Sequence, residues 1–235
     1  MKTNKSLIVL ASPYYIFSAR NFDSPLNFIS QESVKILYST LLVENYLKIL
    51  NSKKYNIDLI IPEDDYEYLP GIFHSIHTKI HKFRLENLSS DLEQIQKIIF
   101  KGDYRKILIL NGYISNLKVE TLDFTFNSIP EDSEKIILFV DEKNVINGFA
   151  TNESKFSSID ILLKPFKNYD LLIRKILSLD AEIQVINEFN SCTTINDLIS
   201  VYYDFKKQGQ KQNSLYINQF FNHFSKQLTK RMVQD

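Results

Sequence analysis

Cysteine and glycine are both scarce in this sequence. Its one cysteine, Cys192, cannot form an internal disulfide or a cysteine-based zinc cluster, and it fits a reducing compartment. The 235 residues include only 5 glycines, and none of them stands in a P-loop or a dinucleotide-binding fingerprint. The sequence therefore offers neither of the two common glycine-rich nucleotide motifs.

Net charge and long apolar runs are also lacking. The 28 basic and 28 acidic residues cancel, so the overall charge indicates neither nucleic acid nor an anionic membrane as partner. The apolar run at 7–11 is shorter than the roughly 7–15 residues of a secretion-signal core. No run approaches the roughly 20 residues of a membrane span. We expect a cytoplasmic protein without a membrane or nucleic-acid partner.

Short apolar segments alternate with helical patterns along the chain. This alternation is typical of βαβ units in a mainly parallel sheet, and dense apolar runs are typical of strands covered on both faces. We expect strands at 7–11, 58–61, 79–83, 107–110, 136–140, 145–150, 159–163 and 182–186. We expect helices at 33–53, 89–99, 117–127, 169–177, 194–207 and 215–232. The predicted fold class is an α/β three-layer sandwich around a mainly parallel central sheet.

The last predicted helix follows a short polar stretch. Composition divides the chain into an α/β domain at 1–208 and a C-terminal helical extension at 209–235. Apolar side chains recur along the extension at helical spacing and form one stripe. The stripe consists of Leu215, Ile217, Phe220, Phe221, Phe224, Leu228 and Met232. We favour docking of this stripe on its own domain, but an exposed stripe would bind a partner, most simply a second copy of the chain.

Two landmarks follow the first and the fourth predicted strands. The first strand leads into Pro13 and the loop 14–21, which contains no glycine and has Arg20 as its only basic residue. The fourth strand leads into Asn111, with Tyr113 two residues further on.

Two more landmarks lie in the C-terminal half of the chain. The hairpin between the fifth and sixth strands begins at Asp141 and has Gly148 near its end. The turn before the helix at 194–207 contains Ser191 and Thr193.

The order of the elements and these landmarks resemble the nucleotide-diphospho-sugar transferases, the A-type glycosyltransferase architecture, over about residues 5–205. The narrower resemblance is to a bacterial family of uncharacterised glycosyltransferase-like proteins found near radical-SAM or selenium-related genes. In that family a glycine-containing basic loop would hold nucleotide phosphates, and aspartates stand where this sequence has Tyr113, Ser191 and Thr193. The resemblance implies a degenerate member, in which the scaffold positions are kept and the metal positions are not.

The resemblance also implies which residues would form the site. A cleft for a nucleotide or nucleotide-sugar would be lined by Pro13, Tyr14, Arg20, Asn111, Tyr113 and Gly148. Asp141 would be the catalytic base, although ordinary hairpin chemistry explains an aspartate there as well. Transfer leaves negative charge on the diphosphate, which such enzymes usually neutralise with Mg²⁺ or Mn²⁺ held by carboxylates. We therefore expect no cofactor, except Mg²⁺ or Mn²⁺ if the protein is active.

Two local clusters offer alternative sites. Asp64 and Asp65 follow the second strand and could form a replacement metal site, but a solvated acidic turn explains them more simply. Three histidines, His74, His77 and His81, have the spacing of metal ligands on one helix. The strand predicted at 79–83 would separate them, so surface histidines are the simpler interpretation.

Three functions stay open at this point. We favour a non-catalytic relative of the transferases that binds a ligand or a partner. The second is an active glycosyl- or nucleotidyltransferase with an atypical or metal-independent site, in which Arg20, Asp141 and Asp64 or Asp65 supply the charge. The third is a homo-oligomeric assembly component that acts through the helix at 215–232.

Overall fold

The structure is a computed structural model that describes residues 6–12, 14–20, 22, 26, 28–76, 78–102, 104–143, 145–153, 174, 176–179, 181–208 and 215–232. Side chains of the last helix are described as far as Ser225. The predicted strand at 159–163 and most of the predicted helix at 169–177 lie outside the described residues, as do Pro13 and His77.

Seven strands form one mixed sheet. They are β1 (Ser6–Ala11), β2 (Asn56–Pro62), β3 (Thr78–Phe83), β4 (Lys106–Asn111), β5 (Lys135–Val140), β6 (Ile146–Thr151) and β7 (Glu182–Ile186). Their order across the sheet is β3-β2-β1-β4-β6-β5-β7. Strand β6 is antiparallel to both of its neighbours, and every other pair of neighbours is parallel. The apolar runs thus predicted each of these strands, and the mainly parallel sheet is confirmed.

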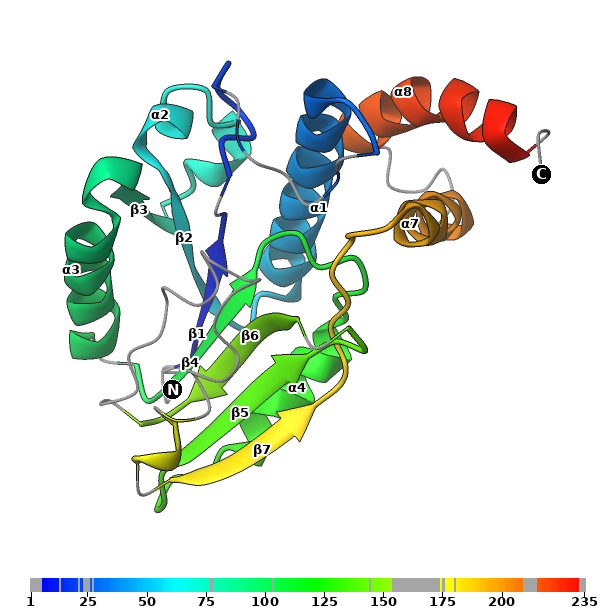
Figure 1. Cartoon of the computed structure of the whole chain (residues 1–235). Helices are drawn as coiled ribbons and strands as arrows, with labels where there is room; N and C mark the ends of the chain where they lie inside the picture. The colour runs from blue at the N-terminus through cyan, green and yellow to red at the C-terminus, as the bar shows by residue number, and fades with distance from the viewer. Residues whose placement is uncertain are drawn as a thin grey trace.

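Helices cover both faces of the sheet (Figure 1). The α-helices are α1 (Gln31–Ser52), α2 (Glu63–Tyr66), α3 (Leu88–Lys101), α4 (Val119–Ser128), α7 (Ile195–Gln208) and α8 (Leu215–Met232). Two 3₁₀ turns, η1 (Gly71–Phe73) and η2 (Leu85–Asn87), flank β3. Neither α2 nor the two turns was predicted, because they are too short to show helical periodicity.

The core divides at the sheet, as β1 illustrates. Ile8 and Leu10 face a cluster that α1, α4, α7 and α8 complete, whereas Leu7 and Val9 face a second cluster built mainly with α3. All six residues of β1 are buried, which explains why its sequence is apolar without alternation. The arrangement is the three-layer sandwich that the sequence predicts.

Helix α8 lies across α1 and beside α7 (Figure 1). Ile217, Phe220 and Phe224 are buried in the core cluster that α1 shares. The imidazole Nε2 of His223 is 2.8 Å from the hydroxyl of Ser33, near the start of α1. Ile217, Phe220 and Phe224 of the apolar stripe therefore dock on their own chain, as we favoured, whereas Leu215 is exposed. A homodimer through this helix stays a prediction.

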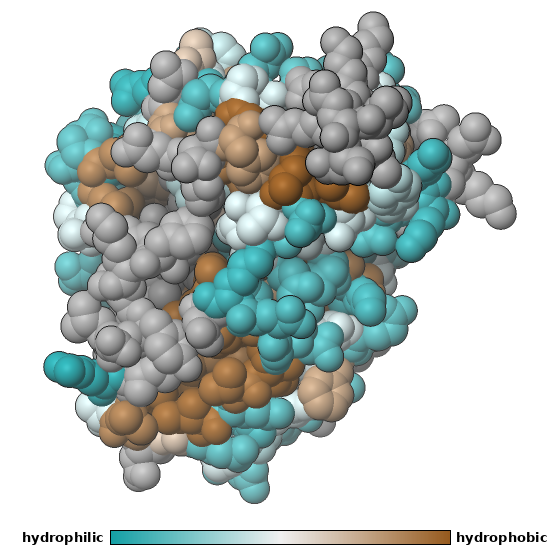
Figure 2. Space-filling model, turned by 45° about the vertical axis from the view of Figure 1, so that its right-hand side comes forward, coloured by the Kyte–Doolittle hydropathy of each residue, from teal (hydrophilic) through white to brown (hydrophobic). Residues whose placement is uncertain are grey.

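Figure 2 shows polar and apolar residues interspersed over much of one face. A larger apolar area lies low in the view, at the height where Figure 1 places β5 and β7. Among the described residues, no helix is both long enough and apolar enough to cross a membrane.

Candidate functional site

The candidate site lies where the strand order reverses. The chain places β2 and β3 on one side of β1 and then returns to place β4 on the other side. In open α/β sheets, ligands bind beyond the carboxyl ends of the strands at such a reversal. Here the backbone N–H of Ser12 donates to the carbonyl of Ile60 at 2.8 Å, and that of Gly112 donates to the carbonyl of Ala11, also at 2.8 Å. These bonds bring the segments that follow β1, β2 and β4 together.

The loop that follows β1 surrounds a carboxylate from α2. Three consecutive backbone N–H groups donate to Asp65: those of Ile16 and Phe17 to Oδ2 at 2.7 and 3.1 Å, and that of Ser18 to Oδ1 at 2.8 Å. Asp65 is fully buried, so the prediction of a solvated turn is wrong for this residue. Burial of the charge is tolerated because each oxygen accepts at least one backbone hydrogen bond.

Basic side chains flank the same loop. The guanidinium of Arg20 forms an ion pair with Asp64 at 2.9 Å and lies over the ring of Tyr15, 5.4 Å from its centroid. The amino group of Lys35, on α1, donates to the carbonyl of Ser18 at 2.8 Å. Arg20 and Asp64, predicted for two different roles, are thus direct partners at the surface.

A stack of aromatic rings stands beside this loop. The ring centroids of Tyr38 and Tyr113 are 4.2 Å apart, and Tyr14 stacks against Tyr113 at 5.8 Å and against Phe22 at 4.8 Å. The hydroxyl groups of Tyr113 and Ser12 share a short hydrogen bond. Two predicted cleft residues, Tyr14 and Tyr113, are therefore in contact with each other.

Burial makes these two tyrosines harder to ionise. Burial raises the pKa of Tyr14 to about 12. It raises the pKa of Tyr113 well above its usual value, and this side chain is only 3% exposed. A phenol is neutral near pH 7 even at its usual pKa, and burial makes loss of the proton from these two side chains harder still.

Asn111 and Gly148 also have structural contacts. The side-chain Oδ1 of Asn111 accepts from the backbone N–H of Tyr113 at 3.0 Å, which shapes the turn after β4. Gly148 lies in β6 opposite Leu110, and a Cβ atom there would stand 2.6 Å from the carbonyl oxygen of Ile109. Close approach of two strands therefore explains the glycine without a ligand.

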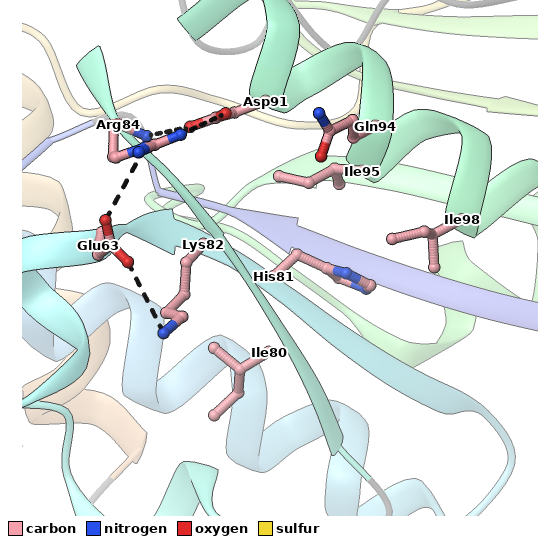
Figure 3. A pocket seen from close by; sticks show the side chains of 9 residues that line it. All are labelled: Glu63, Ile80, His81, Lys82, Arg84, Asp91, Gln94, Ile95 and Ile98. Atoms are coloured by element: carbon pink, nitrogen blue, oxygen red, sulfur yellow. Dashed lines mark hydrogen bonds and ion pairs between the residues drawn. The ribbon is translucent and has the colours of Figure 1, made fainter. Parts of the chain in front are cut away.

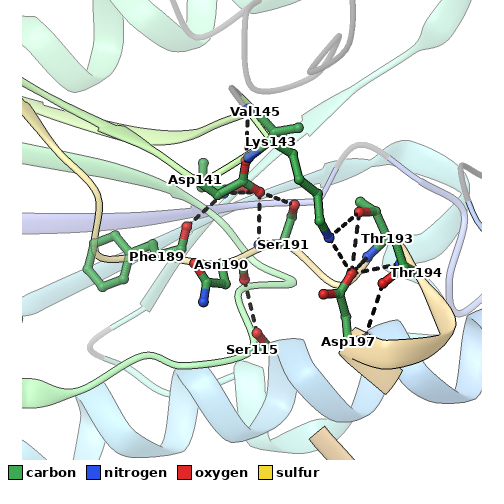
Figure 4. A network of polar contacts seen from close by, with 11 residues as sticks. Ser115, Asp141, Lys143, Val145, Phe189, Asn190, Ser191, Thr193, Thr194 and Asp197 are labelled. Atoms are coloured by element: carbon green, nitrogen blue, oxygen red, sulfur yellow. Dashed lines mark hydrogen bonds and ion pairs between the residues drawn. The ribbon is translucent and has the colours of Figure 1, made fainter. Parts of the chain in front are cut away.

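Asp141 is the centre of a buried hydrogen-bond network (Figure 4). Its Oδ1 accepts from the backbone N–H groups of Lys143 and Val145, both at 2.9 Å. Its Oδ2 accepts from the hydroxyl of Ser191 at 2.6 Å and from the side-chain amide of Asn147 at 3.3 Å. The carboxylate thus shapes the turn between β5 and β6 and joins it to the segment that precedes α7.

Asp197 forms a second network beside the first (Figure 4). It accepts from the backbone N–H of Thr194 at 2.7 Å and from the amino group of Lys143 at 2.5 Å, while its own N–H donates to the hydroxyl of Thr194 at 3.2 Å. This reciprocal pair is a capping box that starts α7. Burial alone would raise the pKa of Asp197, but the hydrogen bonds from Lys143, Thr193 and Thr194 outweigh burial and lower it.

These arrangements do not fit a Mg²⁺ or Mn²⁺ site. Such ions take oxygen ligands, and Mg²⁺ is usually held by one or two carboxylates together with water and substrate phosphates. Within the part of the chain that the structure describes, no group of three or more His, Cys, Asp or Glu residues is placed to hold a metal. Asp65, Asp141 and Asp197 direct their oxygens at the protein's own donors instead.

Sequence reasoning missed a buried pair at the edge of the sheet. The imidazole Nε2 of His81, on β3, is 2.7 Å from the carboxylate of Asp58, on β2, and both side chains are at most 9% exposed. His81 is therefore not a surface histidine. It lies on β3, whereas His74 precedes that strand, so the two histidines do not share a helix. An aspartate inside the apolar run at 57–61 is the signal that could have revealed the pair, because a buried carboxylate needs a partner.

His81 also lines a pocket of about 360 Å³ between β3 and α3 (Figure 3). Its wall includes Arg84, whose guanidinium is 3.2 Å from Asp91 and 3.9 Å from Glu63. Ile95 of α3 contributes an apolar side chain. The charged groups of this pocket are thus paired with one another at the sheet edge, away from β1 and β4.

Comparison with known proteins places the fold. No family model and no curated protein matches the sequence. A protein from Desulfovibrio desulfuricans G20, provisionally described as a nucleotide-diphospho-sugar transferase, superposes with a TM-score of 0.66 over 97% of this chain and 98% of that chain, at 13% identity. This chain has the nucleotide-diphospho-sugar transferase fold. The 4-diphosphocytidyl-2C-methyl-D-erythritol synthase of Anaerococcus prevotii DSM 20548 shares it with a TM-score of 0.50, over 86% of this chain and 97% of that chain, at 14% identity.

The similarity confirms the predicted architecture at the level of the fold. Identities of 13% and 14% carry no statement about activity. The narrower bacterial family and the degeneracy that we inferred from it stay predictions. So do the site roles of Tyr14, Arg20, Asn111, Tyr113 and Asp141.

Proposed function

We propose that this protein is a non-catalytic relative of the nucleotide-diphospho-sugar transferases, which binds a ligand or a partner and transfers neither sugar nor nucleotide. One observation supports the proposal most strongly. Three carboxylates beyond the carboxyl ends of the strands, those of Asp65, Asp141 and Asp197, are bound by donors of the protein itself. Degeneracy relative to the narrower bacterial family is part of this proposal.

The chemistry of transfer explains why this observation matters. The leaving diphosphate gains negative charge, and a metal held by carboxylates is the usual means of stabilising it. A carboxylate that already accepts several short hydrogen bonds has fewer lone pairs left to offer a metal. At the corresponding positions Tyr113 is neutral and stacked, and Ser191 donates its hydroxyl to Asp141. The described carboxylates are therefore not ready ligands for the metal ion that usually supplies the positive charge.

One observation favours the second candidate, a metal-independent transferase. Arg20 and Lys35 bring two positive charges to the loop after β1, and the Arg20 side chain is 58% exposed. Such cations can stabilise a developing phosphate charge without a metal. Arg20 already pairs with Asp64, however, which reduces the charge that it offers.

A ligand panel with matched variants tests the proposal. The purified protein is heated with nucleotides and nucleotide-sugars, with and without Mn²⁺ or Mg²⁺, and each mixture is also assayed for transfer and hydrolysis products. A ligand at 100 times its Kd stabilises the folded state by about 2.7 kcal/mol. We expect any stabilising ligand to act without metal and to leave no product.

Arg20→Ala should weaken the binding of such a ligand. Arg105→Ala should not, because Arg105 is exposed just before the amino end of β4, whereas the candidate site lies at the carboxyl ends of the strands. Product that forms with Mn²⁺ or Mg²⁺ and disappears with a chelator would contradict the non-catalytic function. Product that forms equally with and without chelator would favour the metal-independent enzyme.

A further inference from the structure

Strand β3 forms one edge of the sheet. It pairs with β2 on one side, and in the described part of the chain no strand pairs with its other side. Such an edge presents a row of backbone N–H and C=O groups to which a further strand can bind.

Two side-chain contacts hold this edge in place. The imidazole of His81 is 2.7 Å from the carboxylate of Asp58, on β2. The hydroxyl groups of Thr78 and of Tyr46, on α1, are 2.8 Å apart. An incoming strand therefore meets a template that is already ordered, which lowers the entropy cost of binding.

Helix α3 makes this edge one wall of a groove (Figure 3). The pocket of about 360 Å³ is lined by Ile80, His81 and Lys82 together. Because successive residues of a strand point to opposite faces of a sheet, a pocket that contacts all three lies along the edge of the strand. Ile95 and Ile98 of α3 supply an apolar wall, and Ile98 is 58% exposed. When an extended peptide adds a strand to a sheet edge, such pockets take its side chains.

Exposed apolar side chains are concentrated around this edge. Ten large apolar side chains are exposed among the described residues, and five of them lie in the segment 66–98, which contains β3. These five are Tyr66, Tyr68, Ile76, Leu85 and Ile98. A single exposed apolar residue needs no explanation, but this concentration beside an open groove favours a surface that another protein covers.

The charge of β3 selects the kind of partner. The strand contains Lys79 and Lys82 and no acidic residue. Glu63 lies 3.9 Å from Lys82, but the two side chains are 51% and 42% exposed, so this pair contributes little. Arg84, just beyond the strand, is already paired with Asp91 at 3.2 Å. The positive charge that the edge offers to a partner therefore comes from the two lysines.

A second copy of the chain fits this edge poorly. Antiparallel pairing of two β3 strands about their common centre places Lys79 opposite Lys82 of the other copy. Like charges directly opposite each other destabilise an antiparallel pair. The same two lysines attract an acidic strand, so they favour a different partner over self-association.

We propose that the groove between β3 and α3 binds an extended segment of a partner protein in which acidic and apolar residues alternate. The segment adds a strand to the sheet along the outer edge of β3. Its apolar side chains pack against Ile95 and Ile98, and its acidic side chains lie near Lys79 and Lys82. The inference goes beyond the proposed function, because the groove lies away from β1 and β4, and it holds whether the site at those strands binds a ligand or transfers a group.

The test measures the fluorescence anisotropy of a labelled peptide of alternating valine and glutamate, with a peptide of alternating valine and lysine as the reference. We expect the glutamate peptide to bind at least about fivefold more tightly, because the two lysines attract one peptide and repel the other. The double variant Lys79→Glu, Lys82→Glu should lose this preference. Lys206→Glu, Lys207→Glu is the matched control, since it makes the same change of net charge at exposed residues of α7, which Figure 1 shows on the other side of α1.

A second pair of variants tests the apolar wall of the groove. Ile98→Gln should weaken the binding of the glutamate peptide, because it replaces an apolar side chain that lines the groove. Phe124→Gln should not, because this residue of α4 is similarly exposed, at 57%, but lies outside the groove. Urea denaturation verifies that each variant folds.

Hydrogen exchange locates the bound peptide, and we expect residues 78–83 to gain protection when the glutamate peptide is added. If the folded double variant at Lys79 and Lys82 keeps the preference for that peptide, or if the wild type shows none, the inference is wrong. Protection of 78–83 that rises with protein concentration in the absence of peptide would assign the edge to a second copy and overturn the inference too. Metal-dependent transfer by the wild type would contradict the proposed function and leave these peptide measurements unaffected, so the two failures are distinguishable.

Discussion

Replacement of Asp141 separates a structural role from a catalytic one. In Asp141→Ala, the N–H groups of Lys143 and Val145 lose their acceptor, and the hydroxyl of Ser191 loses its partner. Each buried donor left unsatisfied costs about 1–3 kcal/mol, although water that enters the space recovers part of this. We expect a loss of about 3 kcal/mol in the free energy of unfolding. For a domain of this size that corresponds to about 6–12 °C in Tm.

Urea denaturation followed by circular dichroism measures this loss. Asp132→Ala is the control, because Asp132 is exposed in the turn before β5 and should change the free energy of unfolding by less than about 0.5 kcal/mol. A network role predicts that Asp141→Ala is destabilised whether or not any ligand is present. If Asp141→Ala unfolds at the same urea concentration as the control, the hydrogen bonds do not stabilise the hairpin and a role in chemistry regains support.

Three more perturbations follow from the fold. The lowered pKa of Asp197 means that its ionised form stabilises the folded state at any pH above the unfolded pKa of about 3.9. The difference in the free energy of unfolding between the wild type and Asp197→Asn should therefore shrink as the pH falls from there towards the folded pKa. Urea midpoints measured at several pH values test this. Gly148→Ala should cost about 1–3 kcal/mol from contact with the backbone of β4, whereas Gly71→Ala, which has open space, should cost far less. Phe220→Ala should lower the free energy of unfolding by about 3–5 kcal/mol, because the ring is fully buried. Phe124→Ala should change it little, because Phe124 is 57% exposed. A mild effect of Phe220→Ala in thermal unfolding would mean that α8 contributes little to the core.

The strands and helices were predictable because patterns of neighbouring residues determine them. Each described strand coincides with an apolar run, and the helix predicted at 215–232 has those bounds in the structure. The capping box of Thr194 and Asp197 is also visible in four consecutive residues. Periodicity and capping act over a few residues, so one sequence suffices to read them.

The site was much less predictable, because its contacts join distant parts of the chain. Asp65 binds N–H groups that stand 47–49 residues earlier, and backbone donors have no sequence signature. Asp141 meets Ser191 across 50 residues. The acidic turn after the second strand therefore predicted that Asp65 is exposed to solvent, whereas the structure shows that it is buried.

The contacts around Tyr113 explain why a single Tyr113→Asp substitution would not create a metal site. At the position where the resemblance implies an aspartate, Tyr113 stacks on Tyr38, contacts Tyr14 and shares a hydrogen bond with Ser12. A carboxylate in its place would lose that packing and would face the charge of Asp65, which already acts to raise the pKa of the tyrosine. Two nearby carboxylates repel each other unless a cation lies between them or one of them is protonated. Because three backbone N–H groups of the loop after β1 donate to Asp65, a metal site at this place would require both the aromatic stack and the contacts of Asp65 to change.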